Sequence, residues 1–163
     1  MARVELPQGR GPEVMRALAV APHFGGVVAA YEDAVAQSPL DPRLHELVRY
    51  RVALLNQCTV WLGYRRDGSG VSDDELAGLA DWRSSSSLTP AERAALDFTE
   101  QFCGDSAAIS DELIAELERL LPPGHVVELA LVVGKYLAMG RFMQVLGLDQ
   151  SCDVADLQAA TAR

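Results

Sequence analysis

Four side chains able to do chemistry lie at fixed intervals in an otherwise apolar, helical-looking run, HELVRYRVALLNQCTVWLGYRR at residues 45–66. Glu46 could exchange protons, Cys58 could act as a nucleophile, Trp61 could shape a pocket, and Arg65 could bind an anion. On one straight helix, the twelve residues from Glu46 to Cys58 would span about 18 Å, too far for joint action. The run must therefore bend if these groups share a site.

Asn56 is the natural position for that bend, because asparagine is unfavourable inside a helix and favourable as an N-cap. We predict that one helix ends at Asn56 and that a second begins there. Cys58 would then lie in the first turn of the second helix, where backbone N–H groups lower a thiol pKa. Trp61, Leu62 and Arg65 would share its face, at spacings of three, four and seven residues. The first helix could lie alongside and bring the glutamate back toward the cysteine.

Helix signals recur along the rest of the chain, and apolar residues follow them at steps of three and four. The predicted starts are Asp41 with Pro42, Ser72 with Glu75, Thr89 with Pro90 and Glu92, and Ser110 before acidic residues. No alternating strand pattern is convincing. We predict an all-α, single-domain helical bundle of about seven or eight helices over residues 12–148, with weakly ordered termini at 1–11 and 149–163. Residues 125–146 are apolar nearly all round, as expected of a central helix or a subunit interface.

Composition excludes several classes of function. The formal net charge of −9 and the lack of a basic cluster argue against nucleic-acid binding. The N-terminus has no apolar signal segment, and the longest apolar stretch is broken by Glu128 and Lys135, so we expect no membrane association. Cysteines at 58, 103 and 152 suit a reducing cytoplasm better than a disulfide framework. Neither a metal-ligand spacing nor a phosphate loop occurs, so we predict no metal and no cofactor.

The order and spacing of the helical segments resemble those of the carboxymuconolactone decarboxylase and alkyl-hydroperoxidase-like family. The likeness covers residues 12–148 and includes ALAVAPHFGGVVAAYEDAV, LDPRLHELVRYRVALLNQC, GVSDDELAGLADW, LTPAERAALDFTEQF and VVELALVVGKYLAMGRFMQVLGL. The resemblance implies an alkyl-hydroperoxidase-like helical fold. It also implies a homo-oligomer, either a dimer, a trimer or a hexamer, which the apolar 125–146 helix could help to form.

The resemblance further implies a redox motif that this sequence keeps only in part. The redox-active branch carries a glutamate twelve residues before the first cysteine of C-x-x-C, and a histidine four residues after the second cysteine. Glu46 and Cys58 keep their positions, whereas Trp61 replaces the second cysteine and Arg65 replaces the histidine. A dithiol mechanism needs a resolving thiol, and an arginine stays protonated. We therefore expect the dithiol peroxidase activity to be lost.

The leading hypothesis is a non-redox, cofactor-free lyase or isomerase of this family. It would decarboxylate, isomerise, eliminate or cyclise a small carboxylate-bearing or ring-shaped substrate, in bacterial secondary metabolism or aromatic catabolism. Glu46 would be the general acid or base, with a pKa raised by burial, and Arg65 would bind a carboxylate or an enolate-like intermediate. With Cys58 these form the predicted catalytic set. The predicted substrate-binding side chains are His45, Trp61, Leu62 and Tyr64.

Two other hypotheses remain open. In one, the protein is a non-catalytic small-molecule-binding or structural homologue, with the old pocket filled by Trp61. In the other, residual thiol chemistry uses Cys58 alone or with Cys103 or Cys152. Each site residue also has a structural explanation: Cys58 could simply pack, Glu46 could pair with Arg49, Arg51 or Arg65, and Arg65 could be a solvated cation.

Overall fold

The computed structural model describes residues 2–149, which form α-helices and short 3₁₀ turns and contain no strand. Eight α-helices lie within this range, as predicted. They are α1 (Glu13–Val20), α2 (Pro22–Ala36), α3 (Pro42–Asn56), α4 (Thr59–Gly63), α5 (Asp73–Gly78), α6 (Pro90–Cys103), α7 (Asp111–Leu120) and α8 (His125–Leu146). The 3₁₀ turns are Leu79–Ser84 and Ser106–Ala108. The all-α prediction is confirmed for the described part of the chain.

Capping residues set the boundaries of these helices, as the sequence indicates. The Asp41 carboxylate accepts from the backbone N–H groups of Arg43 and Leu44. Capping boxes join Ser72 to Glu75 and Thr89 to Glu92, and the Ser110 side chain caps α7. Because these interactions are local, they could be predicted from short stretches of sequence.

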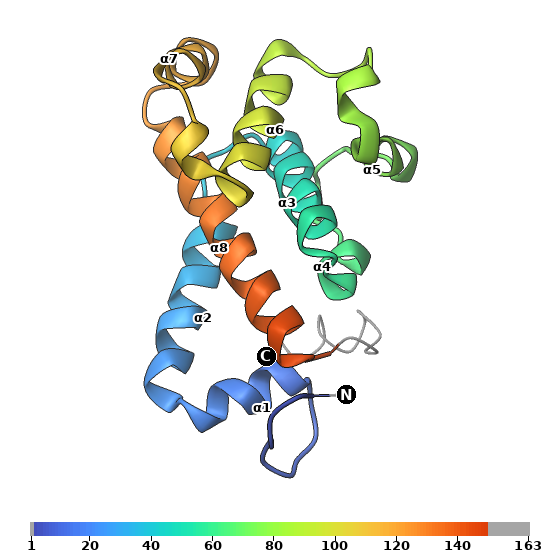
Figure 1. Cartoon of the computed structure of the whole chain (residues 1–163), viewed down its shortest axis with the longest axis vertical. Helices are drawn as coiled ribbons and strands as arrows, with labels where there is room; N and C mark the ends of the chain where they lie inside the picture. Colours follow the sequence, from blue (N-terminus) through green and yellow to red (C-terminus); the bar gives the residue numbers. More distant parts are fainter. Residues whose placement is uncertain (1, 150–163) are drawn as a thin grey trace.

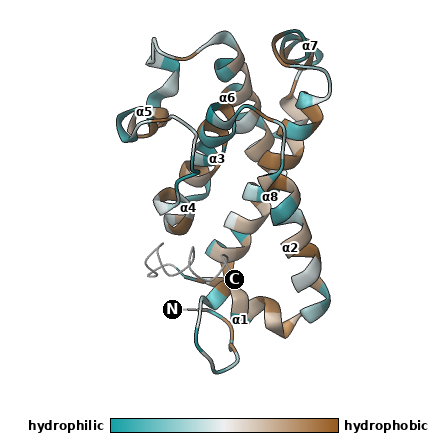
Figure 2. Ribbon diagram, turned by 180° about the vertical axis from the view of Figure 1, so that it is seen from behind, coloured by the Kyte–Doolittle hydropathy of each residue, from teal (hydrophilic) through white to brown (hydrophobic). Residues whose placement is uncertain are grey.

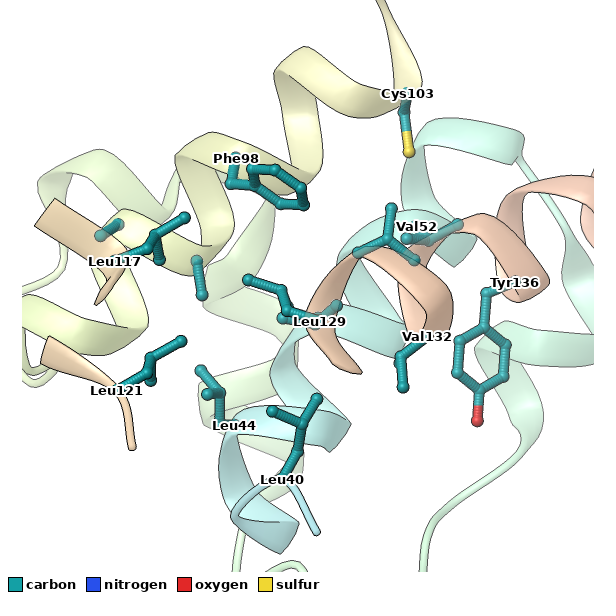
Figure 3. Packing of buried hydrophobic residues seen from close by; sticks show 14 of the residues in the cluster. Leu40, Leu44, Val52, Phe98, Cys103, Leu117, Leu121, Leu129, Val132 and Tyr136 are labelled. Atoms are coloured by element: carbon teal, nitrogen blue, oxygen red, sulfur yellow. The ribbon is translucent and has the colours of Figure 1, made fainter. Parts of the chain in front are cut away.

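Helix α8 runs through the centre of the molecule, with α2 on one side and α3 on the other (Figure 1). The main core lies where α3, α6, α7 and α8 meet, and it is filled mostly by aliphatic side chains (Figure 3). Tyr136 of α8 stands at the edge of this core, with its hydroxyl oxygen directed away from the labelled leucines. A second apolar cluster surrounds Cys58, and a third surrounds Trp82.

Helices α2 and α8 lie side by side and both carry hydrophobic residues (Figure 2). Several of these are exposed, namely Phe24, Val27, Val127, Leu131 and Val145. Exposed apolar groups of this size are common at subunit interfaces. The homo-oligomer nevertheless stays a prediction.

The chain ends are partly tied together. The backbone N–H of Arg3 donates to the carbonyl of Leu146 at 2.8 Å, and the Asp149 carboxylate accepts from the N–H groups of Glu13 and Val14. The predicted weak order of the C-terminus falls mainly on residues 150–163, which lie outside the described residues. Between Ala2 and Asp149, no helix has both the length and the apolar run that crossing a bilayer requires.

Candidate functional site

The predicted bend is present, and it lies between α3 and α4. Helix α3 ends at Asn56, Gln57 takes a left-handed conformation with φ 50°, and Cys58 is the N-cap of α4. Two details differ from the prediction. Cys58 precedes the first turn instead of lying in it, and Asn56 caps nothing in α4, because its side-chain amide donates to the Tyr136 carbonyl of α8 at 3.3 Å. The bend is therefore held by a contact with α8, a helix that is distant in the sequence.

The expected lowering of the Cys58 thiol pKa is wrong. Burial raises the pKa of Cys58, and hydrogen bonds from the backbone of Trp61 and Val60 oppose this only in part. Burial also raises the pKa of Cys103 to about 11. The two thiols lie in different apolar clusters, and Cys152 lies outside the described residues. Since the thiolate is the reactive form, neither described cysteine is activated.

Glu46 is buried and fully paired with Arg49. The Arg49 Nε and Nη2 atoms each donate to a different carboxylate oxygen of Glu46 at 2.6 Å, and both side chains are at most 1% exposed. Of the ion pairs that the sequence left open for Glu46, this is the one that forms. The bidentate contact therefore holds the Glu46 carboxylate in one orientation against the guanidinium.

Arg49 also joins α3 to α4. Its guanidinium donates to the backbone carbonyl of Trp61, and its Nη2 donates to that of Tyr64 at 3.0 Å. These carbonyls lie at the C-terminal end of α4, where a cation is favourable because helix carbonyls there lack partners. Helix α4 has only five residues, so this contact does much to fix its position.

Arg65 does not lie where the sequence pattern predicts. Helix α4 ends at Gly63 and Tyr64 is extended, so Arg65 is not two turns along the helix of Cys58. Its Nη1 donates to the carbonyls of Leu62 at 2.6 Å and Tyr64 at 2.9 Å, and its Nε pairs with the exposed Asp73 at 3.1 Å. In this position Arg65 caps α4 from the solvent side. Its role in ligand binding stays a prediction.

The Trp61 ring lies over a buried ammonium. Lys135 of α8 places its Nζ 4.4 Å from the centre of the Trp61 ring and 3.9 Å from that of Tyr136. The Trp61 ring meets Tyr64 and Tyr136 edge to face, at centroid distances of 5.7 and 5.3 Å. The indole N–H of Trp61 is enclosed and has no hydrogen-bond partner within the described chain. At the position of the second thiol in the redox motif, this chain therefore has a ring packed against Lys135, Tyr64 and Tyr136.

Within residues 2–149, Lys135 pairs with one carboxylate, that of Glu32 on α2, at 2.5 Å. The lysine side chain is 1% exposed and that of Glu32 is 39% exposed, so the pair reaches from the interior to the surface. Burial lowers the pKa of Lys135, whereas the Glu32 carboxylate opposes this change. Lys135 therefore depends on Glu32 for most of its charge compensation.

His45 is buried in the same region and stays neutral. Its Nε2 lies 3.3 Å from the Tyr136 hydroxyl, while Nδ1 has no partner among residues 2–149. Burial, together with the positive charges of Arg66, Lys135 and Arg49, lowers the pKa of His45 to about 3. A neutral imidazole can donate from one nitrogen and accept at the other.

This pKa has a consequence for stability that can be measured. Because His45 has a folded pKa of about 3 and an unfolded pKa near 6.5, the unfolded chain takes up the proton first, and the free energy of unfolding falls as the pH falls from 6.5 toward 3. Between pH 6.5 and 4.5 we expect wild type to lose about 2 kcal/mol more than His45→Gln. Urea unfolding at both pH values measures this difference. Equal losses in the two proteins would contradict the assignment.

His45, Glu46, Arg49, Trp61, Lys135 and Tyr136 are hereafter called the polar cluster. Each member contacts another through the ion pair, the hydrogen bonds and the ring contacts given above. The predicted residues His45, Glu46, Trp61 and Tyr64 are thus brought together, whereas Arg65 faces outward and Leu62 contributes backbone groups. In the described part of the chain, no group of His, Cys, Asp or Glu side chains is arranged to hold a metal ion.

Comparison with known proteins gives the family. Residues 22–101 match the model of the carboxymuconolactone decarboxylase family. Three solved helical structures superpose on most of the chain: a protein of unknown function from Agrobacterium tumefaciens, and uncharacterized peroxidase-related proteins from Silicibacter sp. TM1040 and Ralstonia eutropha JMP134, the last described as an alkylhydroperoxidase AhpD core. Through residues 22–101 this chain belongs to the carboxymuconolactone decarboxylase family, and its fold is alkyl-hydroperoxidase-like.

The structural relatives of this family member are distant in sequence. The Agrobacterium protein is 21% identical with a TM-score of 0.70, over 80% of this chain and 92% of its own. The Silicibacter protein is 21% identical with a TM-score of 0.72, over 84% of this chain and 75% of its own. The Ralstonia protein is 19% identical with a TM-score of 0.68, over 83% of this chain and 75% of its own. At these identities, the likeness establishes the fold alone.

One curated protein that is similar to this chain is described only as uncharacterized. The uncharacterized protein YnjA of Escherichia coli strain K12 is 28% identical over 118 residues, or 69% of this chain. The match covers 63% of the length of YnjA. The comparisons therefore establish the family and leave this member's reaction open.

Three residues of this carboxymuconolactone decarboxylase-like site, namely Arg49, Lys135 and Tyr136, were not predicted as site residues. Lys135 and Tyr136 lie about ninety residues after Glu46 in the sequence and reach it only through the packing of α8 on α3. The chain contains a single lysine, and its position inside a helix that is apolar all round was a usable signal. A cavity of about 230 Å³ lies between Leu47, Leu79 and Trp82, and none of the predicted site residues lines it.

Proposed function

We propose that this protein is a non-redox, cofactor-independent enzyme of the carboxymuconolactone decarboxylase-like family. It would carry out acid–base chemistry on a small carboxylate-bearing or ring-shaped substrate at the polar cluster. The reaction class is decarboxylation, isomerisation, elimination or cyclisation, each of which needs a proton to be moved at a carbon or oxygen next to a carboxyl or carbonyl group.

The observation that carries this proposal is the burial of ionisable side chains where the redox motif has been lost. His45, Glu46, Arg49 and Lys135 are each at most 1% exposed, and Trp61 lies against them. Buried charges are costly, and apolar residues of similar size often stabilise a fold better. Burial lowers the pKa values of His45 and Lys135, and clusters of buried groups with shifted pKa values are typical of functional sites.

We assign the roles within the polar cluster differently from the sequence hypothesis. Glu46 holds Arg49, and Arg49 holds α4, so we assign this pair to positioning. The His45–Tyr136 pair is better placed to move a proton, because the imidazole is neutral and one of its nitrogens is unoccupied by any described residue. A neutral imidazole N–H can also polarise a carbonyl, as it does in other enzymes.

A non-catalytic binding or structural role is the second candidate. It is favoured by the full pairing of Glu46 and by the packing of Trp61 against two apolar clusters. Residual chemistry at Cys58 is the third, and the raised pKa of that thiol argues against it.

Proton exchange in deuterated water separates these candidates. We expect the protein to catalyse exchange or turnover of at least one acid in a panel of small keto and aromatic carboxylic acids, followed by proton NMR. His45→Gln should abolish the activity, since the neutral imidazole that would polarise the substrate carbonyl is gone, and Cys58→Ser should leave it nearly unchanged. The binding candidate instead predicts saturable binding without exchange in any panel member.

The redox candidate is tested with the same proteins. No peroxide should be reduced in the presence of a dithiol donor, because no second thiol stands at position 61. Peroxide turnover that Cys58→Ser removes would overturn the proposal.

A further inference from the structure

Lys135 is held in an arrangement that an ordinary core residue does not need. It is the chain's only lysine, and it lies on a helix whose other residues are mostly apolar. Its ammonium rests against the faces of Trp61 and Tyr136, which attract a cation but carry no neutralising charge. Among the described residues its one carboxylate partner is Glu32. The charge of a buried group is thus balanced from the protein surface.

Glu32 is well placed to leave this contact. Its side chain is 39% exposed, so its carboxylate can turn into the solvent, where water would replace the contact with Lys135. The ammonium of Lys135 cannot do the same, because it is enclosed by α8 and the two rings. A second carboxylate that entered at this point would meet a fixed cation whose present partner is easily replaced.

The surroundings also indicate what such a molecule would look like. Leu131 lies one turn before Lys135 on the same face of α8 and is exposed. The hydroxyl of Tyr31, the residue before Glu32, donates to the Leu131 carbonyl at 2.6 Å, which places α2 and α8 in contact there. A molecule with its carboxylate at Lys135 could therefore lay an apolar body against Leu131 and the ring edges.

We propose that Lys135 is the carboxylate-binding group of the polar cluster, and that the Glu32 carboxylate occupies its ligand position until a small apolar monocarboxylate displaces it. This inference rests on the proposed function for the location of the site, and it replaces Arg65 with Lys135 as the anion-binding group. Glu32 thereby acts as an internal competitor and sets a threshold for ligand binding.

The single lysine makes the test direct. Protein labelled with carbon-13 at the lysine ε-carbon has one such side-chain signal, that of Lys135. We expect benzoate to shift this signal in a saturable way and benzamide, which has the same shape without the charge, to leave it in place. Glu32→Gln removes the competitor and should lower the Kd for benzoate by about tenfold or more, the effect of one charge-assisted contact.

Asp33→Asn is the matched control, since it removes the same charge from the next residue, which is exposed and makes no ion pair with Lys135. Its Kd should stay within about twofold of wild type, as expected for a screened surface charge. Glu32→Gln should also melt at a lower temperature than wild type and regain the difference when benzoate is added, because benzoate restores the missing carboxylate. A structural ion pair would lower the melting temperature without this recovery.

Lys135→Met completes the experiment. It replaces a buried charge by an apolar chain of similar length, so we expect it to fold, and it should lose benzoate binding. Two results would overturn the inference. One is equal benzoate affinity in wild type, Glu32→Gln and Asp33→Asn. The other is benzoate binding retained in Lys135→Met, which can be measured from the Trp61 indole signals. Lys135-dependent binding without proton exchange in any acid would refute the proposed enzyme while leaving this site intact.

Discussion

Arg49→Met is expected to lower the free energy of unfolding by about 3–5 kcal/mol, the usual effect of removing one partner from a buried ion pair. Glu46 would be left as an unpaired carboxylate at 1% exposure, with both oxygens deprived of their donors. The carbonyls of Trp61 and Tyr64 would lose a donor at the same time. Urea unfolding followed by circular dichroism measures the change.

Arg51→Met provides the matched control on the same helix. Arg51 also donates to a carboxylate, that of Glu100, and to the Leu79 carbonyl at 3.0 Å. Glu100, however, keeps hydrogen bonds from Trp82 at 2.8 Å and from Arg83. We therefore expect a loss of about 1 kcal/mol for Arg51→Met, the scale of a partly exposed pair. The assignment fails if Arg49→Met costs no more than this control.

A double variant tests whether the pair itself is the cause. Glu46→Leu with Arg49→Met removes both charges, and it should recover about 2 kcal/mol or more relative to Arg49→Met alone. Recovery would remain incomplete, because the α4 carbonyls still lack the guanidinium. The Cys58 thiol should become easier to label in Arg49→Met, since α4 would be held less firmly.

Gly140→Ala is expected to destabilise the protein by about 1–3 kcal/mol, as overpacking of a tight contact does. A Cβ atom at position 140 would lie 2.4 Å from the Asn56 Nδ2 and 3.2 Å from its Cγ. Asn56 is 4% exposed and its side-chain amide donates to the Tyr136 and Leu137 carbonyls of α8, so moving this side chain would break those hydrogen bonds. The substitution would push α3 away from α8 at the bend that leads to Cys58.

Gly134→Ala is the control for helix propensity. A Cβ atom there would make ordinary contacts of 3.7 Å or more with Phe102 and Tyr31. Since alanine favours the helical conformation, this variant should be neutral or more stable than wild type by about 0.5–1 kcal/mol. Thermal unfolding of both variants measures the contrast. If Gly140→Ala is as stable as Gly134→Ala, the close approach of Asn56 is not a constraint.

The sequence predicted the parts of this structure that depend on neighbours in the chain. The caps at Asp41, Ser72, Thr89 and Ser110 are present, and the bend near Asn56 is where a poor helix residue stands. These features are decided within four or five residues, so composition and spacing are enough to locate them.

The site was only partly predictable, because its geometry depends on helices far apart in the sequence. The predicted position of Arg65 is wrong because α4 has only five residues and ends at Gly63. Arg65 therefore does not lie on the same helix face as Cys58. The pKa of Cys58 was given the wrong direction because spacing alone does not reveal burial. The contacts of Lys135 with Trp61 and Glu32 require the packing of three helices, which no local pattern encodes.

The burial of the chain's single lysine also determines the chemical character of the protein's exterior. Apart from three histidines, all other basic side chains are arginines, so the folded surface offers no lysine amine to acylating reagents, aldehydes or cross-linkers. The positive charge of the surface comes from guanidinium groups, which keep their protons across the whole physiological pH range. Coupling to amine-reactive supports through a lysine would require the interior to open, so such coupling would report the opening of the molecule and not its surface.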